Sequence, residues 1–230
     1  MLRHHPSARR APKEGLPVDS PWEDDGGTLR GGPRAIDLSR APGAGESWGR
    51  PRAVVYLWST CELVFVTNPW QISSRLRVAV LRAFGAEIAD GVIFRPRTRV
   101  KSPWKLHIGA RSWIGEGVWF HNQDHVYVGA DVVISQETFL TTGSHRVRTD
   151  MGLVTSPIRI GDGAWITSRC MVLGGASIGE SAVVQPMTVV KGEVGANRVY
   201  GTPVPPAELG DRFVRETEAA VRGTHPGERA

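Results

Sequence analysis

Residues 160–190 read IGDGAWITSRCMVLGGASIGESAVVQPMTVV, with an aliphatic side chain at every sixth position. Neither the 3.6-residue period of an α-helix nor the two-residue period of an ordinary strand produces this spacing. A fixed repeat of this kind is typical of stacked units that bury their apolar faces only against one another. The stretch therefore predicts an all-β solenoid in which each coil covers the next.

The same spacing begins much earlier in the chain. The repeat positions are Ile88, Phe94, Val100, Ile108, Ile114, Phe120, Val128, Ile134, Leu140, Ile160, Ile166, Val172, Ile178, Val184 and Val190. Glycine follows several of them, as expected at corners where a side chain would clash or a positive φ is needed; these are Gly109, Gly115, Gly129, Gly161 and Gly179. The pattern predicts a solenoid domain over residues 87–205.

The interruptions of the repeat follow a pattern of their own. The step of six lengthens to 8 after Val100 and after Phe120, and to 20 after Leu140. If three repeats make one triangular coil, these three positions fall in one column with Val172 and Val190. The extra residues then leave the solenoid from a single edge. Loops gathered on one side of a rigid scaffold are where binding and catalytic groups are usually placed.

The longest insertion, residues 143–157, contains the first candidate for chemistry. It opens within the sequence LTTGSH at residues 140–145. A neutral imidazole at His145 could accept the proton of an attacking hydroxyl or amine, because its pKa lies near working pH. One coil earlier, Asn122 could hydrogen-bond an acceptor or help hold the geometry. For a lone histidine, a structural or solvated role stays open beside the catalytic one.

Composition and charge restrict the classes of function. A chain of 230 residues with 40% hydrophobic content suits one globular domain with tails. The net charge of +5 fits an anionic partner such as a nucleotide-bearing cofactor, nucleic acid or a membrane, but solvated surface charge explains it equally well. No nucleic-acid motif accompanies the charge. Cys61 and Cys170 have no paired spacing and no targeting segment is convincing, so we expect a cytoplasmic protein.

The segments outside the solenoid differ in composition. Residues 1–50 are rich in Pro, Gly and Arg, which predicts a disordered tail, and a C-terminal helix and tail are expected over 206–230. Residues 51–86 have helical spacing, with one apolar stripe formed by Val54, Leu57, Trp58, Cys61, Val64 and Phe65. Asn68 and Pro69 are expected to open a second helix that Gly85 ends.

Two interpretations of this helical segment stay open. A helical cap would seal the open end of the solenoid, as repeat folds require. Alternatively, residues 53–84 could make peripheral contact with the inner membrane face, since aromatic and aliphatic groups stand beside arginines. The apolar run around Glu62 is too short to span a bilayer.

Residues 81–206 resemble the left-handed parallel β-helix acyltransferases, and in particular the galactoside, maltose and serine O-acetyltransferases and the colanic-acid-type polysaccharide O-acetyltransferases. The likeness is carried by LRAFGAEI at 81–88, SPWKLHIG at 102–109, VISQ at 133–136, LTTGSH at 140–145, IRIGDGAWI at 158–166 and GTP at 201–203. The TGSH element makes the resemblance specific to this superfamily. It does not specify the acceptor.

The resemblance implies an acetyl-CoA-dependent O-acetyltransferase acting on a hydroxyl of a sugar or glycoconjugate. His145 would be the general base for direct attack on the thioester, with Asn122 on the acceptor side. Trp165 and Ser168 would lie beside the pantetheine, and Val190 and Lys191 near the nucleotide. The family further implies a homotrimer with sites between subunits and no metal.

Two other functions remain open at this point. γ-Class carbonic anhydrases share the fold and hold zinc with histidines, and the chain offers His107, His121, His125 and His145. A non-catalytic trimeric scaffold is the second. Zinc retained after dialysis would favour the first, and indifference of every readout to His145→Ala would favour the second.

Overall fold

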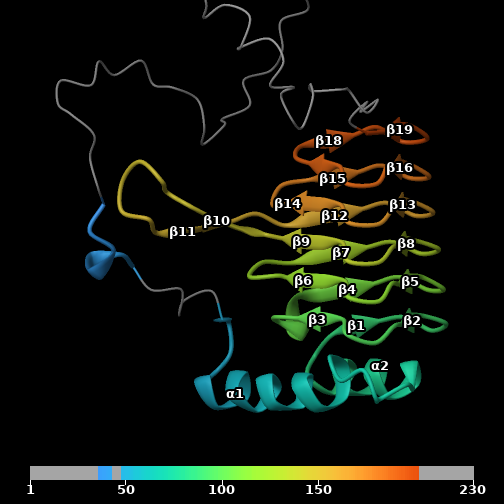
Figure 1. Ribbon diagram of the computed structural model, residues 1–230, viewed down its shortest axis with the longest axis horizontal. Helices are drawn as coiled ribbons and strands as arrows, with labels where there is room; N and C mark the ends of the chain where they lie inside the picture. The colour runs from blue at the N-terminus through green and yellow to red at the C-terminus, as the bar shows by residue number, and fades with distance from the viewer. Residues whose placement is uncertain (1–35, 43–47, 202–230) are drawn as a thin grey trace, which may run out of the picture.

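A computed structural model describes residues 36–42 and 48–201 of the chain. Most of the predicted N-terminal tail and the whole predicted C-terminal helix lie outside these ranges. The described chain forms a triangular β-solenoid, with helices at one end and a hairpin arm leaving its side (Figure 1). The predicted solenoid is confirmed.

Three parallel sheets form the sides of the solenoid. Sheet A contains β1 (Glu87–Ile88), β4 (Leu106–Ile108), β7 (Val126–Val128), β12 (Ile158–Ile160), β15 (Ser177–Ile178) and β18 (Glu193–Val194). Sheet B contains β2 (Ile93–Phe94), β5 (Trp113–Ile114), β8 (Val133–Ile134), β13 (Trp165–Ile166), β16 (Val183–Val184) and β19 (Val199–Tyr200). Sheet C contains β3 (Arg99–Val100), β6 (Trp119–His121), β9 (Phe139–Thr141), β14 (Met171–Leu173) and β17 (Val189–Val190).

The predicted column is present in sheet C. Val100 pairs with Phe120, Phe120 with Leu140, Leu140 with Val172, and Val172 with Val190. Every repeat position from Ile88 to Val190 is buried in the single core that runs along the axis. The six-residue spacing therefore marks buried positions, one in each strand of the repeat, and the insertions leave from the corner between sheets C and A.

The corner glycines avoid a clash and do not supply a positive φ. A Cβ on Gly109 would lie 2.5 Å from the backbone nitrogen of Ala130 in the next coil, which is too close for any real Cβ. Positive φ angles occur instead at nearby residues with side chains, such as Arg111 at 60° and Asp131 at 57°. These two residues stack in successive coils, where Arg111 Nε donates to Asp131 Oδ1 at 2.6 Å.

The helices lie across the first coil and bond to its open strand edges. They are α1 (Arg52–Cys61), the π-helix η3 (Glu62–Val66) and α2 (Ser74–Ala83). Trp58 Nε1 donates to the Val100 carbonyl at 2.8 Å, and the Glu62 carboxylate accepts from the Val100 amide at 2.6 Å. The buried Arg77 donates to the carbonyls of Val66, Asn68 and Phe94. Polar side chains thus satisfy backbone groups that the missing neighbouring coil would have paired.

Two details of the helical prediction are wrong. Of the expected buried stripe, Trp58 is buried but Leu57, Val64 and Phe65 are exposed. The wider turn of the π-helix from Glu62 changes the phase, so that Val66 is the next apolar side chain to be buried after Trp58.

The second helix also begins later than expected. Asn68 Oδ1 accepts from the Trp70 amide and forms a turn, and Ser73 is the N-cap, accepting from the Leu76 amide. The predicted end is confirmed, since Gly85 has a φ of 95° and the Ala86 amide donates back to the Leu81 carbonyl.

The outward sides of the three sheets differ in chemistry. Sheet A presents polar and aromatic residues, namely Glu87, His107, Tyr127, Arg159, Ser177 and Glu193. Sheet B presents only apolar ones, namely Ile93, Trp113, Val133, Trp165, Val183 and Val199. Sheet C presents the mainly apolar column Arg99, Trp119, Phe139, Met171 and Val189. Sheets B and C therefore expose more apolar surface than is usual for a protein face in contact with water, which indicates that they bind other molecules or chains.

Candidate active site

The arm is an antiparallel hairpin of β10 (Gly143–His145) and β11 (Leu153–Thr155). It leaves the solenoid between β9 and β12, at the corner between sheets C and A, and projects sideways (Figure 1). Its base is closed by the Ser156 amide, which donates to the Thr142 carbonyl at 2.9 Å. No buried hydrophobic side chain occurs in residues 143–157, all of which the structure describes. The arm is therefore an appendage that the core does not need.

An ion pair fixes the far end of the arm. Arg146 Nε and Nη2 donate to the two carboxylate oxygens of Asp150, each at 2.8 Å, and the Gly152 amide donates to the same carboxylate at 2.9 Å. The Arg146 hydrogen bonds, followed by the Gly152 amide, hold the pKa of Asp150 far below its ordinary value. The turn next to His145 thus keeps one shape over the whole physiological pH range.

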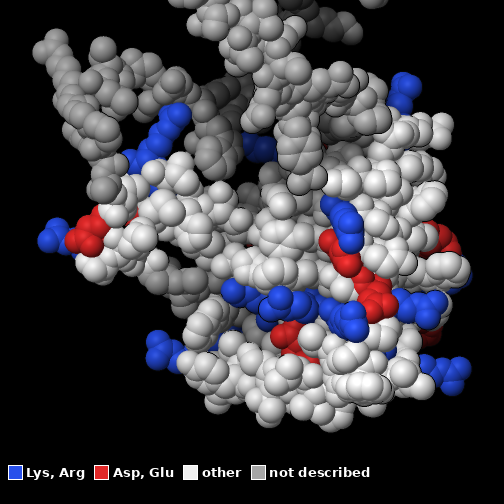
Figure 2. All heavy atoms as spheres, viewed as in Figure 1, with Lys and Arg blue, Asp and Glu red and all other residues white. Residues whose placement is uncertain are grey.

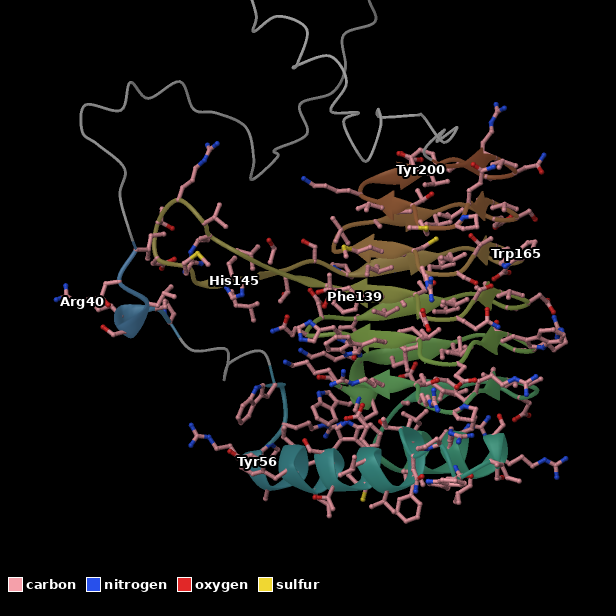
Figure 3. The ribbon with its side chains drawn as sticks, in the orientation of Figure 1. Arg40, Tyr56, Phe139, His145, Trp165 and Tyr200 are labelled. Atoms are coloured by element: carbon pink, nitrogen blue, oxygen red, sulfur yellow. The ribbon has the colours of Figure 1, made fainter. Side chains whose placement is uncertain are left out.

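His145 is exposed, and one of its ring nitrogens is already engaged in a hydrogen bond. His145 Nδ1 lies 2.8 Å from the Met151 carbonyl oxygen, across the hairpin (Figure 3). A carbonyl can only accept, so Nδ1 carries the proton and donates. In the neutral ring, Nε2 is then the nitrogen with a free lone pair. The side chain borders a shallow pocket of about 190 Å³ formed by residues 144–149 and Val154. This is the arrangement that a positioned general base requires.

A hydrogen-bonded chain runs up sheet C to the base of the arm. Lys101 Nζ lies 3.4 Å from His121 Nε2, and His121 Nδ1 lies 3.3 Å from Thr141 Oγ1. Thr141 Oγ1 in turn donates to the Gly143 carbonyl at 3.4 Å. Lysine can only donate and the carbonyl can only accept, so every link points from Lys101 toward the arm. Burial, and then Lys101 and Arg99, lower the pKa of His121, which keeps its ring neutral as this chain requires.

Lys101 and Thr141 were not among the functional residues predicted from the sequence. His121 was predicted only as a candidate zinc ligand. The available signal was the spacing of twenty residues between Lys101, His121 and Thr141, which is one coil including its insertion. Once the column is recognised, that spacing places all three side chains on the same outer face.

Asn122 is fully buried. Its Oδ1 accepts from the Ser102 amide at 3.0 Å and its Nδ2 donates to the Ser102 carbonyl at 2.7 Å. Both ends of the amide are thereby engaged with the neighbouring coil, and no surface is left for an acceptor. Of the two roles predicted for Asn122, holding geometry is the one that its contacts fit, and contact with the acceptor does not fit.

The predicted cofactor residues are spread over two corners of the solenoid. Trp165 is half exposed on sheet B and donates to Ser135 Oγ, and Ser168 follows it at the corner with sheet C. Lys191 follows β17 at the corner from which the arm leaves two coils earlier. Figure 3 shows Trp165 on the side of the solenoid opposite His145. A single chain therefore does not bring His145 and Trp165 together.

Val190 differs from the other predicted cofactor residues in its burial. Its side chain is completely buried in the core because Val190 occupies an inward repeat position. Only its backbone could face a cofactor.

The histidines considered for zinc do not converge. His107 and His125 lie 2.8 Å apart through Nε2 and Nδ1, with Glu87 bonded to His107 at 2.7 Å, whereas His121 lies on sheet C. Within residues 36–42 and 48–201, no three or more His, Cys, Asp or Glu side chains come together in a way that could hold a metal. The ligand set that the carbonic anhydrase alternative requires is not assembled by these residues.

Comparisons with known proteins place the chain among acetyltransferases. No protein-family model matches it. It is 34% identical over 143 residues to an Escherichia coli (strain K12) protein named "Putative colanic acid biosynthesis acetyltransferase WcaF", covering 62% of this chain and 78% of that protein.

Solved structures share the fold. The hexapeptide-repeat acetyltransferase VCA0836 of Vibrio cholerae O1 biovar eltor, complexed with acetyl-CoA, aligns with a TM-score of 0.60 at 22% identity, over 70% of this chain and 89% of that one. A galactoside acetyltransferase in complex with coenzyme A aligns with a TM-score of 0.58 at 20% identity, over 70% and 78%. The solenoid described above is thus a left-handed β-helix.

Proposed function

The chain belongs to the family of hexapeptide-repeat acetyltransferases that includes WcaF, and on this premise we propose that it transfers the acetyl group of acetyl-CoA to a hydroxyl of a sugar or glycoconjugate. The observation that carries the proposal is the state of His145, whose Nδ1 is held by the Met151 carbonyl so that Nε2 can accept a proton. We place the reaction in the cytoplasm, where acetyl-CoA is available.

The reaction is a direct transfer. His145 Nε2 removes the proton of the acceptor hydroxyl as its oxygen attacks the thioester carbonyl carbon. The carbon–sulfur bond then breaks, and the CoA sulfur leaves with the proton that the imidazolium returns. General base catalysis of this kind contributes about 10²- to 10⁴-fold, and holding both substrates in one cleft contributes further. The Met151 carbonyl serves by keeping the ring in the reactive tautomer.

The CoA would lie along the side of sheet B and its corner with sheet C. The half-exposed Trp165 offers an aromatic surface, and Ser168 and Lys191 offer a hydroxyl and a cation for polar and phosphate groups. Because Trp165 is on the other side of the solenoid from His145, a complete site needs a second chain.

A homotrimer supplies that second chain. A ring of three copies uses two different surfaces of each protomer, and sheets B and C are the two apolar sides while sheet A is polar. In such a ring the arm of one copy reaches beyond its own corner toward the apolar side of its neighbour. His145 of one copy would then face the Trp165 side of the next.

The test is a thiol-release assay on the purified full chain. Acetyl-CoA is supplied with a panel of hydroxylated acceptors, and release of the CoA thiol is followed for the native protein, for His145→Ala, and for His107→Ala as a histidine control on the polar side. We expect acceptor-dependent release that falls by about 10²- to 10⁴-fold in His145→Ala and is unchanged in His107→Ala. Acceptor-dependent release that survives His145→Ala would reject His145 as the base, and no release with any acceptor would favour the scaffold alternative.

A further inference from the structure

The helical cap places polar groups as well as apolar ones on its inward side, where Trp58, Val66 and Leu81 join the core. Three polar groups on this side bond the open edges of the first coil: Trp58 Nε1 and the Glu62 carboxylate at Val100, and the Arg77 guanidinium at the Phe94 carbonyl. Serine and arginine do the same elsewhere, since the Phe94 amide donates to Ser74 Oγ and Arg82 Nε donates to the Ile88 carbonyl. Because polar groups take part of the inward side, other large apolar residues of the cap lie on the outside.

The outside carries eight exposed large apolar side chains, which we call the cap patch. Trp70 and Ile72 are the most exposed, at 89% and 85%. The patch consists of Tyr56, Leu57, Leu63, Val64, Phe65, Trp70, Ile72 and Leu76. Scattered single hydrophobic residues are normal on a surface, but a group of eight within 21 consecutive positions marks an interaction site.

The exposed charges on the helices themselves are positive. Arg52, Arg75 and Arg82 are exposed, Arg82 being paired with Asp90 of the first coil, whereas the sole carboxylate of residues 51–86, Glu62, points inward to Val100. Figure 2 shows an uncharged lower end of the molecule with basic side chains at its margins. An apolar helical surface bordered by arginines, with Trp and Tyr among its residues, is the composition that binds the headgroup region of anionic membranes.

We propose that the cap patch docks this protein on the surface of a membrane containing anionic lipids. None of the helices in the described ranges is long and apolar enough to cross a bilayer, so the contact is with the surface. A second copy of the chain fits the patch poorly, because pairing two identical caps would place the same arginines against one another. A bilayer offers acyl chains to the apolar residues and phosphates to the arginines at the same time.

The proposed trimer would strengthen the docking. When three solenoids stand side by side around one axis, their caps share one end and present three patches to one plane. Three weak contacts on one surface bind far more tightly than any single contact. This step rests on the proposed function, whereas the docking of one cap does not.

The experiment is flotation of the full chain with lipid vesicles. One set of vesicles is phosphatidylcholine alone, and the other is phosphatidylcholine mixed with phosphatidylglycerol. The variants are Trp70→Ser with Ile72→Ser, Arg75→Gln, and Leu38→Ser as a matched loss of an exposed apolar residue outside the patch. All substituted residues are exposed, so thermal unfolding should match the native chain.

We expect the native chain and Leu38→Ser to float with the anionic vesicles, and less so as salt is raised. The double serine variant should lose at least about tenfold in partition, and Arg75→Gln roughly fivefold, with the second loss confined to anionic vesicles. The proposal would be overturned if the native protein does not float. It would also be overturned if the double serine variant floats as well as the native protein does. Concentration-dependent self-association that the double variant abolishes, without vesicle binding, would assign the patch to a second copy instead. Thiol release is measured separately, so a failure of docking and a failure of acetyl transfer are distinguishable.

Discussion

The coils and the arm are made by one continuous chain but are held in place by different forces. Each coil contributes its repeat positions and further side chains to a shared core, and the neighbouring coils pair with it strand by strand. The arm contributes none, and is kept in shape by one strand pairing, the Arg146–Asp150 pair and a closed base. Stability and the proposed chemistry therefore lie in separate segments. Changes in the coils should alter folding, and changes in the arm should alter turnover.

The largest effect should come from removing the arm. Gly143 and Thr155 face each other in the hairpin, so a two-residue Asn-Gly turn can join them in place of residues 144–154. We expect acetyl transfer to fall by more than about 100-fold, because His145 is lost. The Tm of the solenoid should stay unchanged, since the removed residues include no buried hydrophobic side chain. A large fall in Tm would show that the arm belongs to the folding unit after all.

A matched pair of truncations should give the next largest effect. Leu140 is fully buried in the coil from which the arm leaves, and Val154 is 42% exposed on the arm. Leu140→Ala should lower the free energy of unfolding by about 2–5 kcal/mol. Val154→Ala should lower it by less than about 0.5 kcal/mol. Urea unfolding of both variants measures the difference, and equal losses would contradict the separation of the two regions.

The smallest effect should follow from loosening the tip of the arm. Asp150→Asn removes the carboxylate that accepts from Arg146 and the Gly152 amide, so His145 and Met151 lose part of their support. We expect kcat/KM to fall roughly tenfold with Tm unchanged.

The stabilisation of the arm by the Arg146–Asp150 ion pair depends on pH in a definite direction. The pKa of Asp150 is depressed in the folded arm, first by Arg146. The stabilisation is therefore present above the ordinary range of an aspartate and is lost only as pH falls through the depressed value. Activity of the native chain should show no step from the arm near pH 4. A step there that Asp150→Asn abolishes would place the pKa higher than the structure indicates.

Burial explains how much the sequence could predict. The repeat from Ile88 to Val190 and the column through Leu140 were predictable because one side chain per strand must be apolar, whatever surrounds it. The position of His145 in a projecting loop was predictable because the insertion after Leu140 interrupts the apolar repeat. The tautomer of His145 was not, because it depends on a carbonyl six residues away across a hairpin.

The helical cap shows why the remaining features could not be read from the sequence. Helical periodicity identifies an apolar side but cannot say which way it faces. Here the strand edges of the first coil require Glu62 and Arg77 inside, and the π-helix shifts the phase at the same point. Likewise, Asn122 looked available for an acceptor until the register placed Ser102 beside it.

The stacking of coils also sets the height of His145 above the helical end of the solenoid. Strands in adjacent coils are about 4.8 Å apart, and a helix with its side chains is about 10 Å thick. The arm leaves at the end of the third coil, so the imidazole of His145, the proposed base, stands about 20 Å above the outer surface of the helices. An acceptor tethered in a bilayer must lift its hydroxyl by that height to be acetylated. The reach of the glycan, counted in sugar units from its anchor, would then decide which residue receives the acetyl group.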